Sequence, residues 1–174
     1  MKKIEQNLIS ELMKNSRRSD RELAHAIGAS QPTITRTRRK LEEEGYIKEY
    51  TTIPDFEKLG YEILALTFVK LKRGLSIEEI EKARKTAQEG FKKDTPFKTI
   101  MMERGTGLGY QGVLISFHQN YSAYLELKNY LRQFRFLKLD EIESFLISLK
   151  DEVHYRPLTF KALAEHLLTL KKEE

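Results

Sequence analysis

Residues 19–45 of this chain read SDRELAHAIGASQPTITRTRRKLEEEG. Ser19 and Glu22 have the spacing of a capping box, which marks the start of a helix. Gly28 is the residue type that most often ends a helix, and Ser30 is a good cap for the next one. We therefore predict two helices joined by a short turn that contains glycine, which is a helix-turn-helix.

The segments on either side complete this predicted domain. Ile4, Leu8 and Leu12 recur at helical spacing, which predicts a first helix that ends near residues 15 and 16. After Gly45 the chain is rich in residues that favour strands, which predicts a small hairpin or wing. These residues are Tyr46, Ile47, Tyr50, Thr51, Thr52 and Ile53. Residues 1–53 are thus expected to form a winged helix-turn-helix domain, followed by a linker over 54–62.

The rest of the chain alternates strand and helix patterns over residues 63–150. The order is βαββαβ, which predicts a ferredoxin-like domain and makes the whole chain α+β. Strands are expected at 63–72, 97–103, 113–118 and 142–149, and helices after Ser76 and after Asn120 or Ser122. Residues 151–174 form an extension with an amphipathic helix, which is expected to pack on its own sheet or on a neighbouring subunit.

The predicted sheet is apolar on both faces. Leu64, Leu66 and Phe68 alternate with Ile63, Ala65, Val69 and Leu71 in the first strand, and the last strand shows a similar pattern. The helices of a ferredoxin-like domain cover one face only, so the other face needs a second cover. A partner subunit supplies it most simply, and we expect a homo-oligomer.

The second helix of the helix-turn-helix carries concentrated positive charge. Four basic residues fall between Ser30 and Leu41 with no acid among them, while Ile34 and Leu41 should face the core. Such a helix face is often simply solvated, but within a helix-turn-helix it is the segment that enters the major groove of DNA. The candidate DNA-binding residues are Arg17, Arg18, Arg21, Ser30, Gln31, Thr33, Thr35, Arg36, Arg39, Lys40 and Lys48.

Composition excludes several other classes of protein. The 174 residues include no cysteine, which removes disulfides, thiol catalysis and thiolate-bound metals. No apolar run approaches the roughly 20 residues that span a bilayer, and no secretory signal is evident, so we expect a cytoplasmic protein without membrane contact. The net charge of +5 permits nucleic-acid binding without establishing it.

The stretch SRRSDRELAHAIGASQPTITRTRRKLEEEGYIKEYTTI resembles the winged helix-turn-helix of the Lrp/AsnC (feast/famine) transcription regulators, over residues 4 to about 60. The βαββαβ order and GLGYQGVLISF, residues 107–117, are similar to that family's RAM domain. The resemblance implies a dimer held by RAM sheets, often assembled into tetramers or octamers. It also implies operator binding with one half-site per recognition helix.

Two positions depart from the family pattern. Arg38 occupies a position that is usually aliphatic, so its stem is expected to lie along apolar surface with its head in solvent, unless the helix is slightly rotated. Gly109 matches the loop that helps to bind an amino-acid effector, but no acidic residue follows it to pair with an ammonium group. The candidate effector-binding residues are Gly107, Gly109, Tyr110 and Gly112.

Other readings of the sequence are weaker. The glycines at 107, 109 and 112 spell G-x-G-x-x-G, but a strand follows them where a dinucleotide site requires a helix, so they predict an irregular hairpin loop. No histidine spacing fits a metal, and we expect no cofactor and no catalytic residue. Two alternatives stay open: an enzyme similar to siroheme decarboxylases, using His118 or His154, and a co-regulator that senses a small molecule without binding DNA.

Overall fold

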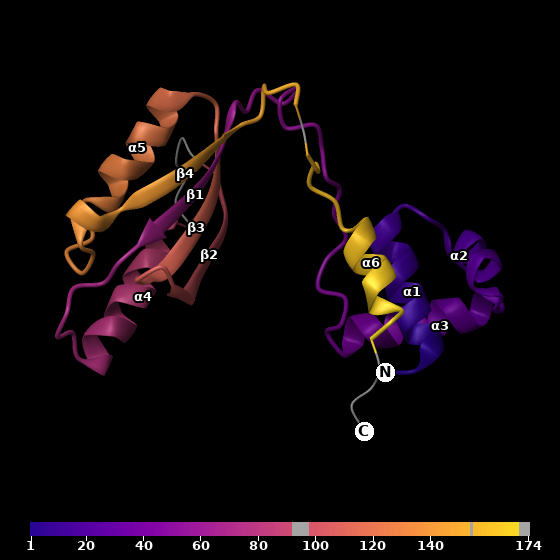
Figure 1. The fold of residues 1–174 in the computed structure, drawn as a ribbon. Coiled ribbons are helices and arrows are strands. Elements are labelled where there is room, and N and C mark those ends of the chain that lie inside the picture. Colours follow the sequence, from indigo (N-terminus) through magenta and orange to yellow (C-terminus); the bar gives the residue numbers. More distant parts are fainter. Residues whose placement is uncertain (92–97, 154, 171–174) are drawn as a thin grey trace. The chain divides into compact units, whose positions relative to one another are not determined.

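A computed structural model describes residues 1–91, 98–153 and 155–170 of the chain. The chain divides into two compact units, one formed by residues 1–54 with 154–174 and the other by residues 55–153. The first unit contains the helices α1 (Lys3–Lys14), α2 (Asp20–Ile27), α3 (Gln31–Glu43) and α6 (Lys161–Leu167), as Figure 1 shows.

Local capping signals set the bounds of the helix-turn-helix, as predicted. The Ser19 side chain accepts a hydrogen bond from the Glu22 amide, and the Glu22 carboxylate accepts one from the Ser19 amide at 2.7 Å. Gly28 ends α2 in the left-handed region with φ of 73°, a conformation that glycine adopts without strain. Ser30 caps α3 by accepting a hydrogen bond from the Thr33 amide at 3.3 Å.

A small apolar core holds these helices together. Leu8, Leu23, Ile34 and Leu41 are completely buried, and they come from α1, α2 and both ends of α3. Because Ile34 and Leu41 lie seven residues apart, they project from the same side of α3. The opposite side of α3 is therefore left facing solvent.

The predicted wing is not a hairpin. Residues 46–55, all of which the structure describes, form an extended segment without paired strands. The Ile47 amide donates to the Leu41 carbonyl at 3.1 Å, and the Ser16 hydroxyl donates to the Thr51 carbonyl at 3.1 Å. Strand-forming residue types favour an extended backbone but do not supply a pairing partner, so the segment is held by the helices instead.

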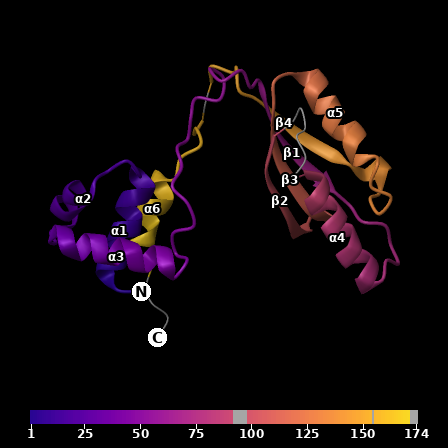
Figure 2. The same ribbon diagram turned by 180° about the vertical axis from the view of Figure 1, so that it is seen from behind.

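The C-terminal extension also differs from expectation, because α6 packs on α1 in the first unit rather than on the sheet. Figures 1 and 2 both show the two helices side by side. Ala164 is completely buried, and its carbonyl accepts a hydrogen bond of 2.8 Å from the buried Ser10 hydroxyl. A fourth helix thus supports the helix-turn-helix from a point more than 100 residues away in the sequence.

Replacing Ser10 by Ala is expected to lower the free energy of unfolding of the first unit by about 1–2 kcal/mol, because the buried Ala164 carbonyl loses its donor. The matched control is Ser16→Ala, which removes an exposed hydrogen bond of the same kind and should cost less. Urea unfolding of both variants tests this. Equal stability of Ser10→Ala and the parent protein would show that α6 does not dock on α1.

The second unit is the predicted α+β, ferredoxin-like domain. Its four-stranded antiparallel sheet has the order β2-β3-β1-β4. The elements are β1 (Ile63–Val69), α4 (Ile77–Phe91), β2 (Lys98–Gly107), β3 (Tyr110–His118), α5 (Tyr121–Leu131), a short 3-10 turn (Leu139–Glu141) and β4 (Glu143–Ser148). The expected strand at 97–103 is longer than predicted at its C-terminal end, and Phe97 lies outside the described residues. The expected linker is a turn that packs on the sheet, with the rings of Phe56 and Phe117 stacked at 4.1 Å.

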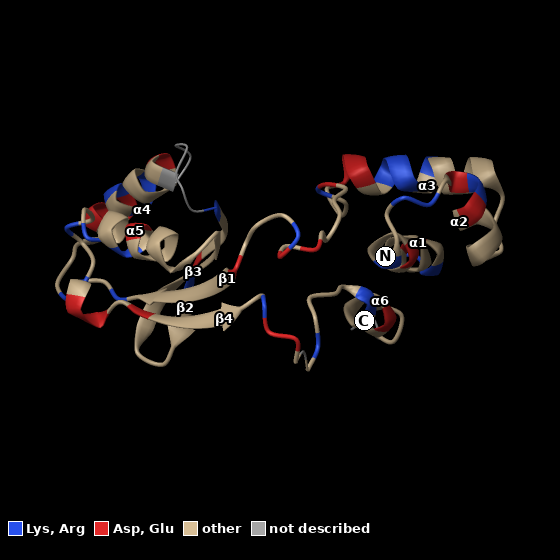
Figure 3. Cartoon of the chain, turned by 90° about the horizontal axis from the view of Figure 1, so that it is seen from above, with Lys and Arg blue, Asp and Glu red and all other residues tan. Residues whose placement is uncertain are grey.

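The two helices α4 and α5 lie on one face of this sheet (Figure 3). The core on that face includes Leu114, Leu127, Leu131 and Phe134. On the opposite face, Leu66 pairs with Phe145 of β4 and with Ile115 of β3, and Phe145 is 65% exposed. This apolar face, which we call the open face, has no cover within the described part of the unit beyond Phe56 and Tyr61 at one end and Tyr110 beside Phe68 at the other.

The glycine-rich segment forms the expected hairpin, and a tight turn closes it. Leu108 and Gly109 have φ of 50° and 80°, and Gly107 pairs directly with Tyr110. Two consecutive left-handed residues are typical of a two-residue hairpin turn. The irregularity lies earlier, between Arg104 and Gly107, where the strand register shifts.

Candidate nucleic-acid interface

The exposed side of α3 carries the charge pattern of a nucleic-acid contact surface. Arg36, Arg39 and Lys40 are exposed, and Arg36 lies opposite the buried residues Ile34 and Leu41. Figure 3 shows basic residues along the middle of α3 and acidic residues at its C-terminal end. Positive charge thus collects on a solvent-facing helix of a helix-turn-helix, which is the geometry that fits a major groove.

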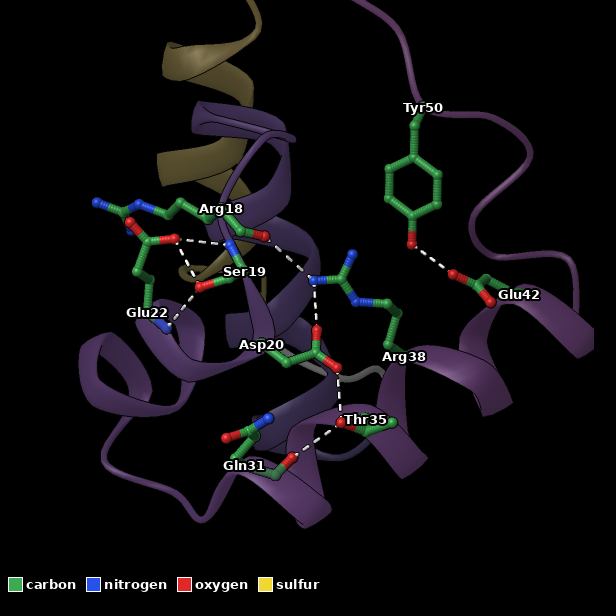
Figure 4. Close-up of polar contacts among 9 residues, drawn as sticks. All are labelled: Arg18, Ser19, Asp20, Glu22, Gln31, Thr35, Arg38, Glu42 and Tyr50. Atoms are coloured by element: carbon green, nitrogen blue, oxygen red, sulfur yellow. Dashed lines mark hydrogen bonds and ion pairs between the residues drawn. The ribbon is translucent and has the colours of Figure 1, made fainter.

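A carboxylate on α2 fixes the orientation of α3. Asp20 Oδ1 forms an ion pair of 2.6 Å with Arg38 Nη2, and its Oδ2 accepts a 2.6 Å hydrogen bond from the Thr35 hydroxyl (Figure 4). Arg38 also donates to the Arg18 carbonyl at 3.4 Å. One carboxylate therefore joins two successive turns of α3 to the start of α2.

The structure corrects the prediction for Arg38. Its head is not in solvent, since the side chain is only 20% exposed and lies between Asp20 and the ring of Tyr50, 5.7 Å from the ring centroid. Tyr50 in turn donates to a Glu42 carboxylate oxygen at 2.6 Å, as Figure 4 shows. Arg38 therefore links α2, α3 and the extended segment, and it does not face outward with Arg36.

Replacing Asp20 by Ala is expected to destabilise the first unit by about 1–3 kcal/mol, because the half-buried Arg38 guanidinium loses its carboxylate partner. Asp20→Asn keeps an acceptor for Thr35 and should cost less. Arg39→Ala is the matched control, because it removes an ion pair whose members are 80% and 61% exposed and should cost little. Thermal unfolding ranks the three variants, and a loss in Asp20→Ala no larger than in Arg39→Ala would contradict this role.

The remaining basic residues of α3 differ in how they are held. Arg36 forms no hydrogen bond or ion pair with the described residues. Arg39 pairs with Glu43 one turn away at 2.7 Å, in an exposed contact that a phosphate or a base can replace. Lys40 pairs with the buried Glu5 of α1 at 2.7 Å, and this hydrogen bond, with one from the Lys2 amide, lowers the pKa of Glu5.

The other candidate residues lie near the start of α2 or α3, except Lys48, which follows the end of α3. Arg18 and Arg21 line a shallow depression with His25, while Arg18 also pairs with Glu11 of α1. Arg17, Gln31 and Lys48 are exposed. Ser30 and Thr33 are engaged mainly in capping α3, with their hydroxyls 2.8 Å apart. The structure therefore leaves arginine side chains available at the start of α2 and on α3, while the hydroxyls of Ser30 and Thr33 already form hydrogen bonds within the fold.

Candidates in the second unit are not gathered into one site. Gly107, Gly109 and Tyr110 lie on the β2–β3 hairpin, and only Gly112 lines the cleft described further below. His118 is completely buried beside Ser116, with 2.9 Å between its Nε2 and the serine hydroxyl, and burial lowers its pKa. It cannot reach a ligand without disrupting the end of β3, and His154 lies outside the described residues.

The described residues contain neither a cluster of metal ligands nor a membrane-spanning helix. No three of their His, Asp or Glu side chains come together as a metal site requires. None of their helices is both long and apolar enough to cross a membrane.

These features define a two-unit protein with a helix-turn-helix and a ferredoxin-like domain. Residues 1–48 match a family described as winged helix-turn-helix DNA-binding. An uncharacterised HTH-type transcriptional regulator of Pyrococcus furiosus is 35% identical over 89 residues, which cover 51% of this chain and 60% of that protein. LrpC of Bacillus subtilis, an HTH-type transcriptional regulator, is 42% identical over 69 residues, covering 40% of this chain and 48% of LrpC. The chain thus spans about half the length of the curated relatives that it matches.

Solved structures extend the similarity of fold to both units. The structure of Bacillus subtilis LrpC has a TM-score of 0.65 at 24% identity and covers 90% of this chain and 99% of its own. An AsnC family regulator from Agrobacterium tumefaciens has a TM-score of 0.71 at 16% identity. A Neisseria meningitidis regulator in complex with L-Met has the same TM-score at 18% identity. Each match covers 94% of this chain and 99% of the other chain. The resemblance to Lrp/AsnC regulators and the fold that it implied are confirmed.

Proposed function

We propose that this protein is a sequence-specific DNA-binding transcription regulator that inserts α3 into the major groove. The observation that carries the proposal is the exposed side of α3, where Arg36 and Arg39 project from a helix fixed on its other side by Ile34, Leu41 and Asp20. A guanidinium can bind the O6 and N7 atoms of guanine in the major groove with two hydrogen bonds. Action on chromosomal DNA would place the protein in the cytoplasm.

Phosphate contacts would orient α3 on the duplex. Arg17, Arg21 and Lys48 lie on segments next to the helix-turn-helix and carry exposed cationic heads. Contacts of this type fix the register of a protein on DNA without reading sequence. We therefore assign these three residues to backbone contacts, and Arg36 and Arg39 to bases.

The functional unit in this proposal is a homodimer or a larger oligomer joined through the open face. Leu66, Ile115 and Phe145 lie side by side on that face, and Phe145 would stay largely in water in a monomer. A second copy of the sheet has the complementary apolar surface and the same strand geometry. Dimerisation would place two copies of α3 on one duplex, which then needs two related half-sites.

Selection of bound duplexes from a random pool tests the proposal. We expect enrichment of a palindromic sequence whose half-sites lie about 10–10.5 base pairs apart or a multiple of that distance. Binding should be saturable and should weaken as salt rises, because phosphate contacts release counterions. Failure of any sequence to be enriched would favour the alternative of a co-regulator that does not bind DNA.

A small-molecule effector is part of this proposal. The Neisseria regulator of similar fold was solved with L-Met, and the hairpin residues Gly107, Gly109, Tyr110 and Gly112 of this chain are the sequence-based candidates for such a site. The hairpin itself contains no acidic residue after Gly109, which argues against a free amino acid at this position. The effector class therefore has to be sought from the chemistry of the second unit.

A further inference from the structure

A cleft of about 260 Å³ lies between α4 and the sheet in the second unit. Its walls are mainly apolar and include Val69, Leu71, Met102, Leu114 and Phe134. The cleft is partly open to solvent and borders the packed core on this face of the sheet. An engineered cavity of about 150 Å³ binds benzene, so this cleft is large enough for a body of one to two rings.

Three small residues create the space. Ala83 and Ala87 lie one turn apart on α4 and both line the cleft, where larger side chains would normally fill the gap between a helix and a sheet. Gly112 lies on the β3 side, and a Cβ there would come within 2.9 Å of Val69 Cγ2. The cleft is therefore built into the sequence of both walls.

A guanidinium stands at the edge of this apolar space. Arg104 pairs with Gly112 across the β2–β3 ladder, so its side chain leaves the sheet on the same face as Gly112 and lines the cleft. It forms no ion pair or hydrogen bond with the described residues. Arg84, also in the lining, pairs with Glu81 at 2.9 Å but is 52% exposed.

The cleft offers no described acidic side chain for a positive group. Glu103 contributes to the lining, but it pairs with Val113 and precedes Arg104, so its side chain leaves the sheet on the opposite face. Glu81 does not belong to the lining. An ammonium group in this cleft would lack a carboxylate partner, whereas a carboxylate would meet a forked guanidinium donor.

We propose that this cleft binds a small monocarboxylate with an apolar body, which Arg104 holds by its carboxylate and the small residues of α4 admit between helix and sheet. The ligand class is an aromatic or branched carboxylate without an ammonium group. The proposal concerns ligand binding by the second unit and does not depend on DNA binding by α3. It is therefore tested without DNA, and its failure would leave the proposed interaction with DNA untouched.

Calorimetric titration of the full chain with three matched probes tests the proposal. Indole-3-acetate carries the proposed chemistry, 3-methylindole lacks the carboxylate, and tryptophan adds one carbon that bears an ammonium group. We expect indole-3-acetate to bind most tightly. Arg104→Gln should lower the affinity for indole-3-acetate roughly ten- to hundredfold, as expected for loss of a hydrogen bond to a charged group. The affinity for 3-methylindole should stay unchanged. Arg135→Gln, an exposed position outside the lining, is the matched control.

A second variant and a second readout locate the site. Ala87→Leu fills the cleft and should reduce binding of both indole-3-acetate and 3-methylindole at least tenfold, while leaving the protein folded. In spectra of the ¹³C-labelled methionine methyl groups, the ligand should shift Met102, which lines the cleft, and not Met101, which lies on the other face. The proposal is overturned if indole-3-acetate shows no saturable binding in the millimolar range, if tryptophan binds better, or if Arg104→Gln and Ala87→Leu both bind it as the parent protein does.

Discussion

Replacing Arg36 by Ala is expected to weaken binding to a selected operator by about 1–3 kcal/mol, which is the usual cost of losing one base-reading contact. Arg36 is exposed on the side of α3 opposite Ile34, and among the described residues it has no hydrogen bond or ion pair that its removal would break. The loss should therefore appear in binding and not in the free energy of unfolding. Fluorescence anisotropy at physiological salt measures it, with thermal unfolding as the parallel readout.

The comparison among arginines makes this experiment specific. Arg39→Ala should also weaken operator binding, although the parent side chain must first leave Glu43. Arg17→Ala should weaken binding to all sequences alike and reduce its salt dependence, as expected for a phosphate contact. Arg135→Ala, on the second unit, is the inert control. If Arg36→Ala and Arg39→Ala both keep full operator affinity, α3 does not read bases through these residues.

Phe145→Asp is expected to weaken the free energy of association of the subunits by roughly 3 kcal/mol or more. The reason is that an unpaired carboxylate would have to be buried between two apolar sheets. Phe145 is 65% exposed on β4, the edge strand of the sheet, so the change should leave the fold of a single chain intact. Analytical ultracentrifugation should show monomers at concentrations where the parent protein is dimeric. Operator affinity should fall with it, since the two half-sites are then bound separately.

Leu125→Asp is the matched control for this prediction. Leu125 is 41% exposed on α5, which covers the opposite side of the sheet, so the same kind of charge is placed away from the open face. We expect Leu125→Asp to sediment as the parent protein does. A Phe145→Asp variant that remains dimeric would mean that the open face is covered in some other way.

Local signals made the helix-turn-helix predictable. The bounds of α2 and α3 depend on Ser19, Gly28 and Ser30, whose capping roles involve residues only a few positions away. The apolar residues on both sides of the first strand also gave the open face correctly, because alternation along a strand decides which face a side chain takes. These features follow from short-range geometry that the sequence displays directly.

Features that depend on distant contacts were missed. The amphipathic pattern of residues 160–168 predicts a helix, but not that Ala164 packs against Ser10 of α1. Arg38 looked out of place because its partner Asp20 lies 18 positions earlier on another helix. Residues 46–53 have strand propensity, yet pairing needs a second strand at the right distance. In each case the sequence identifies the side chain or segment but not the residues that it contacts in the fold.

The cleft illustrates the same limit for a ligand site. Ala83, Ala87 and Gly112 are unremarkable individually, and only the packing of α4 against β3 brings them together. The glycine-rich motif is more conspicuous in the sequence, but most of it forms a hairpin turn. The sequence does show two alanines one turn apart on a helix that is otherwise rich in charged residues. This pattern indicates a cleft only once the strand that faces the helix is known.

The position of α3 in the major groove is tested most directly by methylation interference on the selected operator. Methylation of guanine N7 blocks the major-groove edge that an arginine fork would bind. We predict two clusters of interfering guanines, one in each half-site and about 10–10.5 base pairs or a multiple of this apart, and a weaker effect at one guanine per cluster in Arg36→Ala. Binding that is indifferent to N7 methylation throughout the operator would contradict recognition by α3 in the major groove.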